Sequence, residues 1–125
     1  MIPLIERSMV ETIYKVLHEE EWRIASATSS YAGSPDDQRD GFIHFSTAPQ
    51  LTGTLEKHFS GSVYIAAFDP ALFPAKALCW EPSRSGALYP HLYGTFNIKC
   101  ALKTWHMSIA KGGEINLSFL DGETL

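Results

Sequence analysis

The stretch from Val63 to Phe68, with the sequence VYIAAF, is apolar at every position and constrains the fold most strongly. A short strand that is apolar on both faces is typical of the centre of a covered sheet. Asp69 and Pro70 follow directly, and they predict that the strand ends there because proline has no N–H to donate to a neighbouring strand. The chain is therefore expected to contain a β-sheet with this strand in its interior.

Shorter patterned segments surround that strand. Two short helices are expected, one opening at Glu19 and one following the capping-box pattern Thr47-x-x-Gln50. The polar stretch from Ser26 to Asp40 is interpreted as a loop. These elements predict an α+β fold in which two short helices pack on a β-rich body. Further strands are expected where β-branched and aromatic residues gather, at 12–17, 42–45, 76–81, 98–107 and 115–119.

The length and composition favour one domain over residues 1–125, with residues 1–11 as a loosely packed N-terminal extension. Hydrophobic residues make up 45% of the 125, which suffices for a core without a disulfide or metal. The formal net charge is −4, so the chain as a whole does not attract phosphate backbones. A basic DNA-binding domain is excluded, and an RNA partner is not favoured by charge.

The cysteine pattern and the lengths of the apolar runs indicate the compartment. Cys79 and Cys100 have neither the CxxC spacing of a redox motif nor the density of a secreted disulfide scaffold. No apolar run approaches the roughly 20 residues that a membrane-spanning helix needs. We therefore expect a cytoplasmic protein with reduced thiols and no membrane partner.

Three segments place polar side chains among apolar neighbours. The first is DGFIHFS, residues 40–46, in which alternation along one strand would turn His44 and Ser46 to the same face. The second is WEP, residues 80–82, which places Glu81 beside a large ring at a strand end. The third is YPHLYG, residues 89–94, in which His91 and Tyr93 share a side if the chain is extended. Together these segments are the candidates for a functional site.

Each candidate also has a purely structural interpretation. His44 alone fits a core histidine bonded to a backbone carbonyl, and Glu81 fits a solvated strand end. Tyr89 and Tyr93 fit packing aromatics. The spacing would also allow a metal site formed by His44, His91 and a carboxylate, but nothing makes that arrangement specific, so no metal is predicted. Two histidines in separate apolar segments, each near a hydroxyl, still favour a shared site.

The same motifs carry a family resemblance. DGFIHFS, WEP and YPHLYG resemble a small bacterial family of unknown function whose usual motifs are G-F-I-H-x-S and F-P-H-L-Y-G, with Tyr89 here in place of phenylalanine. The resemblance runs from about Tyr14 to Met107. The family in turn resembles the ADP-ribosyltransferase fold, in which two small β-sheets open into a cleft that binds NAD. Within that fold it is most similar to the RNA 2′-phosphotransferases.

This resemblance implies a nucleotide site with NAD as the substrate and ADP-ribosyl transfer or NAD glycohydrolysis as the reaction. No glutamate late in the chain aligns with the catalytic glutamate of the ADP-ribosylating toxins, which favours the alternative of a non-catalytic module that binds a nucleotide or a protein. The expected partner is a small-molecule nucleotide. The implied catalytic residues are His44, His91 and Glu81, and the implied nucleotide-binding residues are Ser46, Tyr93 and Lys15.

The resemblance also implies a role for each residue. His44 and Ser46 would hold the ribose or the adjoining phosphate, while His91 would donate a hydrogen bond or act as general acid or base. Tyr93 would stack on the nicotinamide ring, and Glu81 would bind a ribose hydroxyl. Lys15 would neutralise the pyrophosphate; the alternative for this lysine is a surface position without a role.

Overall fold

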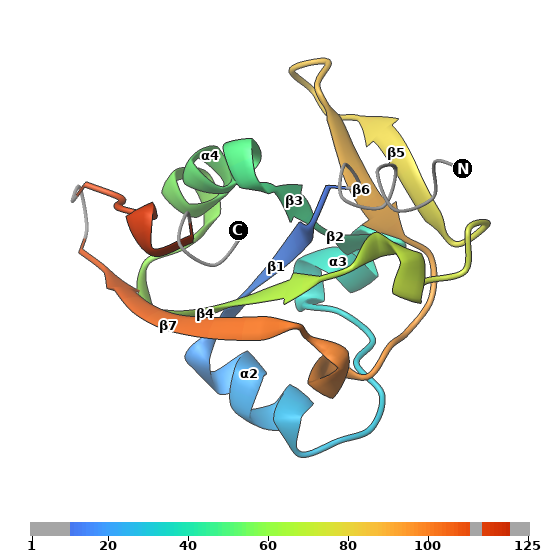
Figure 1. Cartoon of the computed structure of the whole chain (residues 1–125), viewed down its shortest axis with the longest axis horizontal. Helices are drawn as coiled ribbons and strands as arrows, with labels where there is room; N and C mark the ends of the chain where they lie inside the picture. The colour runs from blue at the N-terminus through green and yellow to red at the C-terminus, as the bar shows by residue number, and fades with distance from the viewer. Residues whose placement is uncertain (1–10, 111–113, 121–125) are drawn as a thin grey trace, which may run out of the picture.

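A computed structural model describes residues 11–110 and 114–120, and within these ranges the chain forms two antiparallel β-sheets and three α-helices (Figure 1). The expected α+β class is confirmed, while most of the expected extension, residues 1–10, lies outside the described ranges. None of the described helices has the length and apolar character needed to cross a membrane. The helices are α2 (Glu19–Ser26), α3 (Pro35–Asp40) and α4 (Ala48–His58).

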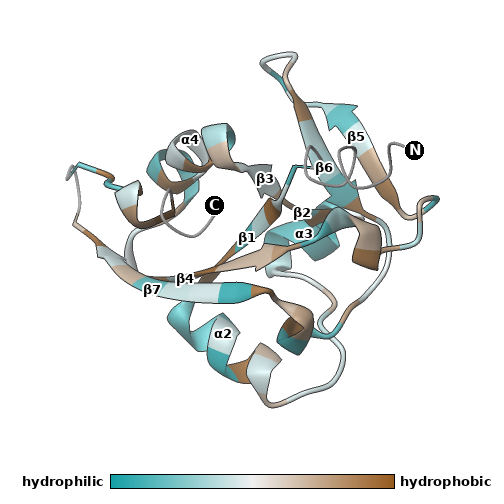
Figure 2. Ribbon diagram, viewed as in Figure 1, coloured by the Kyte–Doolittle hydropathy of each residue, from teal (hydrophilic) through white to brown (hydrophobic). Residues whose placement is uncertain are grey.

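The larger sheet has four strands in the order β3, β1, β4, β7. As expected, the apolar strand β4 is interior, and Figure 2 shows its hydrophobic colouring. Both faces of the sheet are covered, because Ala25 of α2 packs in the core on one face and Leu51 and Leu55 of α4 pack in the core on the other. The strands are β1 (Ile13–His18), β3 (Ser46–Thr47), β4 (Gly61–Phe68) and β7 (Lys103–Ile109).

The smaller sheet has the order β2, β6, β5, with β2 (Ile43–His44), β5 (Leu78–Pro82) and β6 (Leu88–Leu92). The expected strand at 42–45 is confirmed at Ile43 and His44, but its assumed continuation to Ser46 is wrong because the chain changes sheets after Phe45. Ile43 and His44 pair with β6, whereas Ser46 and Thr47 pair with β1. Single-strand alternation therefore does not relate His44 to Ser46.

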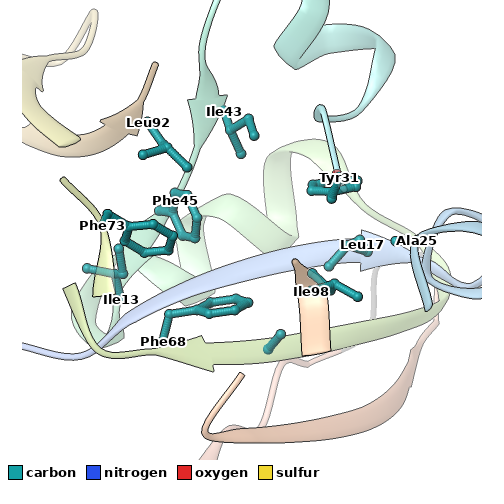
Figure 3. Packing of buried hydrophobic residues seen from close by; sticks show 11 residues of the cluster. Ile13, Leu17, Ala25, Tyr31, Ile43, Phe45, Phe68, Phe73, Leu92 and Ile98 are labelled. Atoms are coloured by element: carbon teal, nitrogen blue, oxygen red, sulfur yellow. The ribbon is translucent and has the colours of Figure 1, made fainter. Parts of the chain in front are cut away.

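Phe45 lies at this change of sheets. Its backbone N–H donates to the carbonyl of Pro90 at 3.0 Å, and its side chain is 1% exposed. Figure 3 shows the Phe45 ring between Leu92 of the smaller sheet and Phe68 of the larger one, and the centroids of the Phe45 and Phe68 rings are 5.8 Å apart. The two sheets thus share one hydrophobic core at the point where the chain passes from one to the other.

The expected loop from Ser26 to Asp40 contains a helix, α3, so the described ranges hold three α-helices where two were expected. The sequence Ser34-Pro35-Asp36-Asp37 starts it with a capping box. The Ser34 hydroxyl accepts a hydrogen bond from the Asp37 N–H at 3.1 Å, and the Asp37 carboxylate accepts one from the Ser34 N–H at 2.9 Å. A serine–aspartate pair three residues apart is a helix-start signal, which the polar composition obscured.

The expected strand 98–107 is confirmed only at 103–107, within β7, and the expected strand 115–119 does not form. Residues 98–100 of the expected strand 98–107 form a 3-10 helix, and residues 118–120 form another where the strand 115–119 was expected. Each is preceded by an asparagine whose side chain accepts from the N–H two residues on, Asn97 from Lys99 and Asn116 from Ser118, both at 2.9 Å. Such local bonds turn the backbone away from an extended course.

Gly33, just before α3, is predicted to be intolerant of any side chain. Its φ is 103°, and a Cβ there would lie 2.7 Å from the Cβ of Asp37. Gly41 is the matched control, because its φ is 91° but its Cβ would meet nothing within 4 Å. Both alanine variants carry left-handed backbone strain, and Gly33→Ala should lose about 1–3 kcal/mol more for the overpacking. Equal losses in urea unfolding would contradict the predicted clash.

Candidate active site

The six residues predicted from the sequence fall into two adjoining groups. Lys15, His44 and Ser46 line a groove of about 530 Å³, hereafter the main groove. The groove also takes lining residues from α3, from α4 and from the turn between β5 and β6. Of the remaining three, Glu81 and His91 lie on the smaller sheet near His44, and Tyr93 directly follows β6. We refer to Phe42, His44, Glu81, His91 and Tyr93 as the two-histidine cluster.

Asp37 is the centre of the hydrogen bonding beneath the groove, and the sequence interpretation missed it. Its carboxylate is 2% exposed. The Lys15 ammonium donates to Oδ2 at 2.7 Å, while the backbone N–H of His44 donates to Oδ1 at 3.1 Å and the His44 Nδ1 lies 2.5 Å from that same oxygen. With the bond from the Ser34 N–H, one carboxylate ties together β1, β2 and the start of α3.

Lys15 is neither on the surface nor free to bind a ligand charge. It is 4% exposed, and besides its ion pair with Asp37 it donates to the backbone carbonyl of His44 at 3.0 Å. A buried ion pair of this kind leaves a costly charge if either partner is removed. Lys15 is therefore not available to neutralise a pyrophosphate, because Asp37 already neutralises its charge.

The surroundings of Asp37 fix its charge. Burial favours the neutral carboxyl, but the hydrogen bond with His44 and the charge of Lys15 outweigh it and hold the pKa of Asp37 well below its ordinary value of 3.8. Asp37 therefore stays ionised across the physiological range and can hold the His44 ring in one orientation.

This lowered pKa predicts an acid-dependent loss of stability. A carboxyl with a lower pKa in the folded chain stabilises fully above its unfolded value of 3.8 and loses that contribution as the pH falls toward the folded value. Asp37→Asn lacks this titration, so the gap in unfolding free energy between wild type and variant should narrow on acidification. Urea unfolding at about pH 7 and about pH 3 would measure the gap. A difference in unfolding free energy that stays the same at both pH values would contradict the lowered pKa of Asp37.

His44 links Asp37 to the two-histidine cluster. Its Nε2 lies 3.1 Å from the carboxylate of Asp40, so both ring nitrogens face acidic groups. His44 pairs directly opposite His91 across β2 and β6, and the centroids of their rings are 5.4 Å apart. The ring of Phe42 stacks on His91 at 4.0 Å. The structure thus brings the two predicted histidines together, which an isolated core histidine would not require.

His91, Glu81 and Tyr93 form the other half of the cluster. The Nδ1 of His91 lies 2.7 Å from Oε1 of Glu81, and the Tyr93 hydroxyl donates to the same carboxylate at 2.8 and 3.0 Å. The hydrogen bond with His91, followed by that with Tyr93, lowers the pKa of Glu81. The bond to Glu81 raises the pKa of Tyr93, which keeps its hydroxyl protonated. Glu81 is therefore a carboxylate that orients two rings and not merely a solvated strand end.

Ser46 lies on the main groove but away from the cluster. Its hydroxyl is 2.8 Å from that of Thr54 on α4. Ser46 and His44 both line the groove although they belong to different sheets, whereas Glu81, His91 and Tyr93 are not among its lining residues. The groove and the cluster therefore meet at His44.

Neither Asp37 nor Phe42 was predicted as part of the site. Asp37 could have been found from the Ser34-x-x-Asp37 capping pattern together with the apolar residues after Gly41. Phe42 shows no such signal, because its stacking on His91 depends on a residue 49 positions away. In residues 11–110 and 114–120, no group of three or more histidine, cysteine, aspartate or glutamate side chains is placed to hold a metal ion.

Two antiparallel sheets that share a core, with a groove and a histidine cluster where they meet, define a small α+β protein with a built polar site. Residues 16–104 match the family described as "Protein of unknown function (DUF952)". The chain belongs to this family, which confirms the expected membership of a family of unknown function. No curated protein matches the chain.

Solved structures of one other protein have the same fold. The crystal structure of protein CC0527 from Caulobacter crescentus has a TM-score of 0.78 and 32% identity, and the alignment covers 87% of this chain and 96% of that one. The solution NMR structure of CC0527 has a TM-score of 0.70 and 33% identity, with 82% and 89% covered. The likeness therefore extends over nearly all of both chains.

Proposed function

We propose that the main groove and the two-histidine cluster bind NAD or ADP-ribose, and that the chain transfers the ADP-ribosyl group or hydrolyses NAD. The observation that carries this proposal is the pairing of His44 and His91 on neighbouring strands, each held by its own carboxylate, at the edge of an open groove. Two oriented histidines beside a groove of this size are typical of a small-molecule site. The two sheets meeting at the groove also fit the ADP-ribosyltransferase resemblance of the sequence.

The reaction would break the bond between C1′ of the ribose and the nicotinamide nitrogen. Nicotinamide leaves as a neutral molecule with the bonding electron pair, and positive charge develops on the ribose. The oxygen of water, or an oxygen or nitrogen of another acceptor, then bonds to C1′ and gives up its proton. Fixed negative charge near the ribose lowers the barrier to the first of these steps.

His91 and Glu81 supply groups suited to those steps. A neutral imidazole whose Nδ1–H donates to Glu81 leaves Nε2 with a lone pair, and Nε2 of His91 has no hydrogen-bond partner among the described residues. His91 can therefore accept the proton of the nucleophile. Glu81, kept ionised, supplies the negative charge, and the ring of Tyr93, 44% exposed, is accessible for stacking on nicotinamide.

On the groove side, His44 and Ser46 would hold the ribose hydroxyls or the adjoining phosphate, with the ligand taking the place of the Asp40 carboxylate at Nε2 of His44. Because Asp37 fixes the His44 ring from behind, that ring needs little reorganisation to bind a ligand. Asp37 is in this scheme a positioning residue that acts through His44.

Isothermal titration with NAD and ADP-ribose tests the binding, and incubation with NAD followed by detection of released nicotinamide tests the catalysis. Binding of both nucleotides together with nicotinamide release is the expected result. Binding without release would leave a non-catalytic nucleotide module. No binding of either nucleotide at millimolar concentration would reject both nucleotide functions.

Protein binding is a second candidate, and the open edge of β1 favours it. β3 pairs with β1 only at Ile13 and Tyr14, and in the described ranges no strand pairs with that edge beyond Tyr14. The main groove runs along this edge, since its lining includes Tyr14, Lys15 and Val16, whose side chains alternate between the two faces. An edge without a strand partner can add an extended peptide as a further strand, here after the side chains that cover Lys15 and Val16, each 4% exposed, have moved aside. Failure of both nucleotides in the titration would leave this candidate standing.

A further inference from the structure

Some of the charged side chains that line the main groove form ion pairs with described residues, and others do not. Four are cationic and three are anionic, although the whole chain carries a net charge of −4. Lys15 is paired with Asp37, and Arg39 lies 3.1 Å from each of the carboxylates of Asp36 and Asp40. These pairs account for every anionic side chain of the groove lining.

Two cations remain. Lys57 lies in the last turn of α4, and Arg84 lies in the turn between β5 and β6. Both are exposed, and neither forms an ion pair with any residue in 11–110 or 114–120. Helix α4 and the β5–β6 turn thus each bring to the groove one positive charge that no described residue compensates, while the acidic side chains of the groove lining are all paired.

We infer that Lys57 and Arg84 form the anion-binding part of the main groove and select ligands that carry phosphate. This inference rests on the proposed function for the identity of the nucleotide, and it replaces Lys15, buried against Asp37, as the source of the neutralising charge. An ammonium and a guanidinium are the side chains suited to phosphate oxygens, the guanidinium through paired N–H donors. The groove would therefore bind ADP-ribose and NAD more tightly than the corresponding nucleosides.

The test compares wild type with Lys57→Gln and Arg84→Gln, with ADP-ribose, inorganic pyrophosphate and adenosine as titrants. Each variant should bind ADP-ribose about tenfold more weakly, a change of about 1.4 kcal/mol, and should bind pyrophosphate more weakly as well. Adenosine, which has no phosphate, should bind the variants and wild type alike. Lys76→Gln is the control, because Lys76 is an exposed lysine that does not line the groove.

The outcomes separate this inference from the proposed function. If ADP-ribose binds wild type and both variants equally, the two cations do not bind phosphate and the inference is wrong, while nucleotide binding stands. If pyrophosphate binds and the variants weaken it but ADP-ribose does not bind, the anion site is supported and the nucleotide function is rejected. If neither ADP-ribose nor pyrophosphate binds wild type, both this inference and the proposed nucleotide function are rejected.

Discussion

Replacing Asp37 with alanine is expected to lower the free energy of unfolding by about 3–5 kcal/mol, because it leaves the buried ammonium of Lys15 without a counter-charge. The substitution also removes the acceptor that holds the Ser34 and His44 N–H groups. Chemical denaturation followed by circular dichroism measures the loss. A loss below about 1 kcal/mol would show that the buried pair contributes little.

Two controls isolate the charge effect in that experiment. Asp36→Ala alters the neighbouring residue of α3, whose ion pair with Arg39 is exposed on both sides, so it should change stability little. Adding Lys15→Met to Asp37→Ala removes the uncompensated charge and should recover part of the loss. If the double variant is as unstable as Asp37→Ala alone, the loss comes from the missing helix cap and not from the uncompensated charge of Lys15.

Replacing His91 with alanine is expected to slow nicotinamide release from NAD about 100-fold or more, the usual contribution of a positioned acid or base. His106→Ala is the matched control, because His106 lies on β7 and bonds to the Ser62 hydroxyl instead of joining the cluster. Since His91 packs against Phe42, His91→Gln should be measured alongside to keep most of that contact. Release unchanged in a folded His91 variant would refute the proposed role of His91.

The fold could be predicted where a strong local pattern coincided with the final environment. The uninterrupted apolar run of β4 specified an interior strand, and the capping box at Thr47 and Gln50 placed the start of α4, where the Gln50 side chain accepts from the Thr47 N–H at 3.0 Å. Helix α3 could not be found from hydrophobic periodicity, because its six residues are all polar or proline and its one buried side chain is the charged Asp37. Its stability comes from the capping box and from Lys15, 22 positions earlier.

The candidate site was predictable in its residues but not in its connections. Its histidines were identifiable because each interrupts an apolar segment, and the structure places them on paired strands. The Lys15–Asp37 pair and the change of sheets at Phe45 depend on contacts between distant segments, which leave no local pattern. Strand alternation, assumed across Phe45, failed there because the Phe45 N–H still bonds to Pro90 of β6, whereas Ser46 already pairs with β1.

The short segment that serves both sheets also determines how the groove can respond to a ligand. Ile43 to Thr47 leads directly from the α3 side of the groove to the start of α4 on the other, and it is pinned to β6 at one end and to β1 at the other. The α3 and α4 walls are therefore joined by a few extended residues, and strand pairing at both ends prevents these residues from acting as a hinge. A ligand would meet a groove already at its final width, and binding would cost little conformational entropy in the protein.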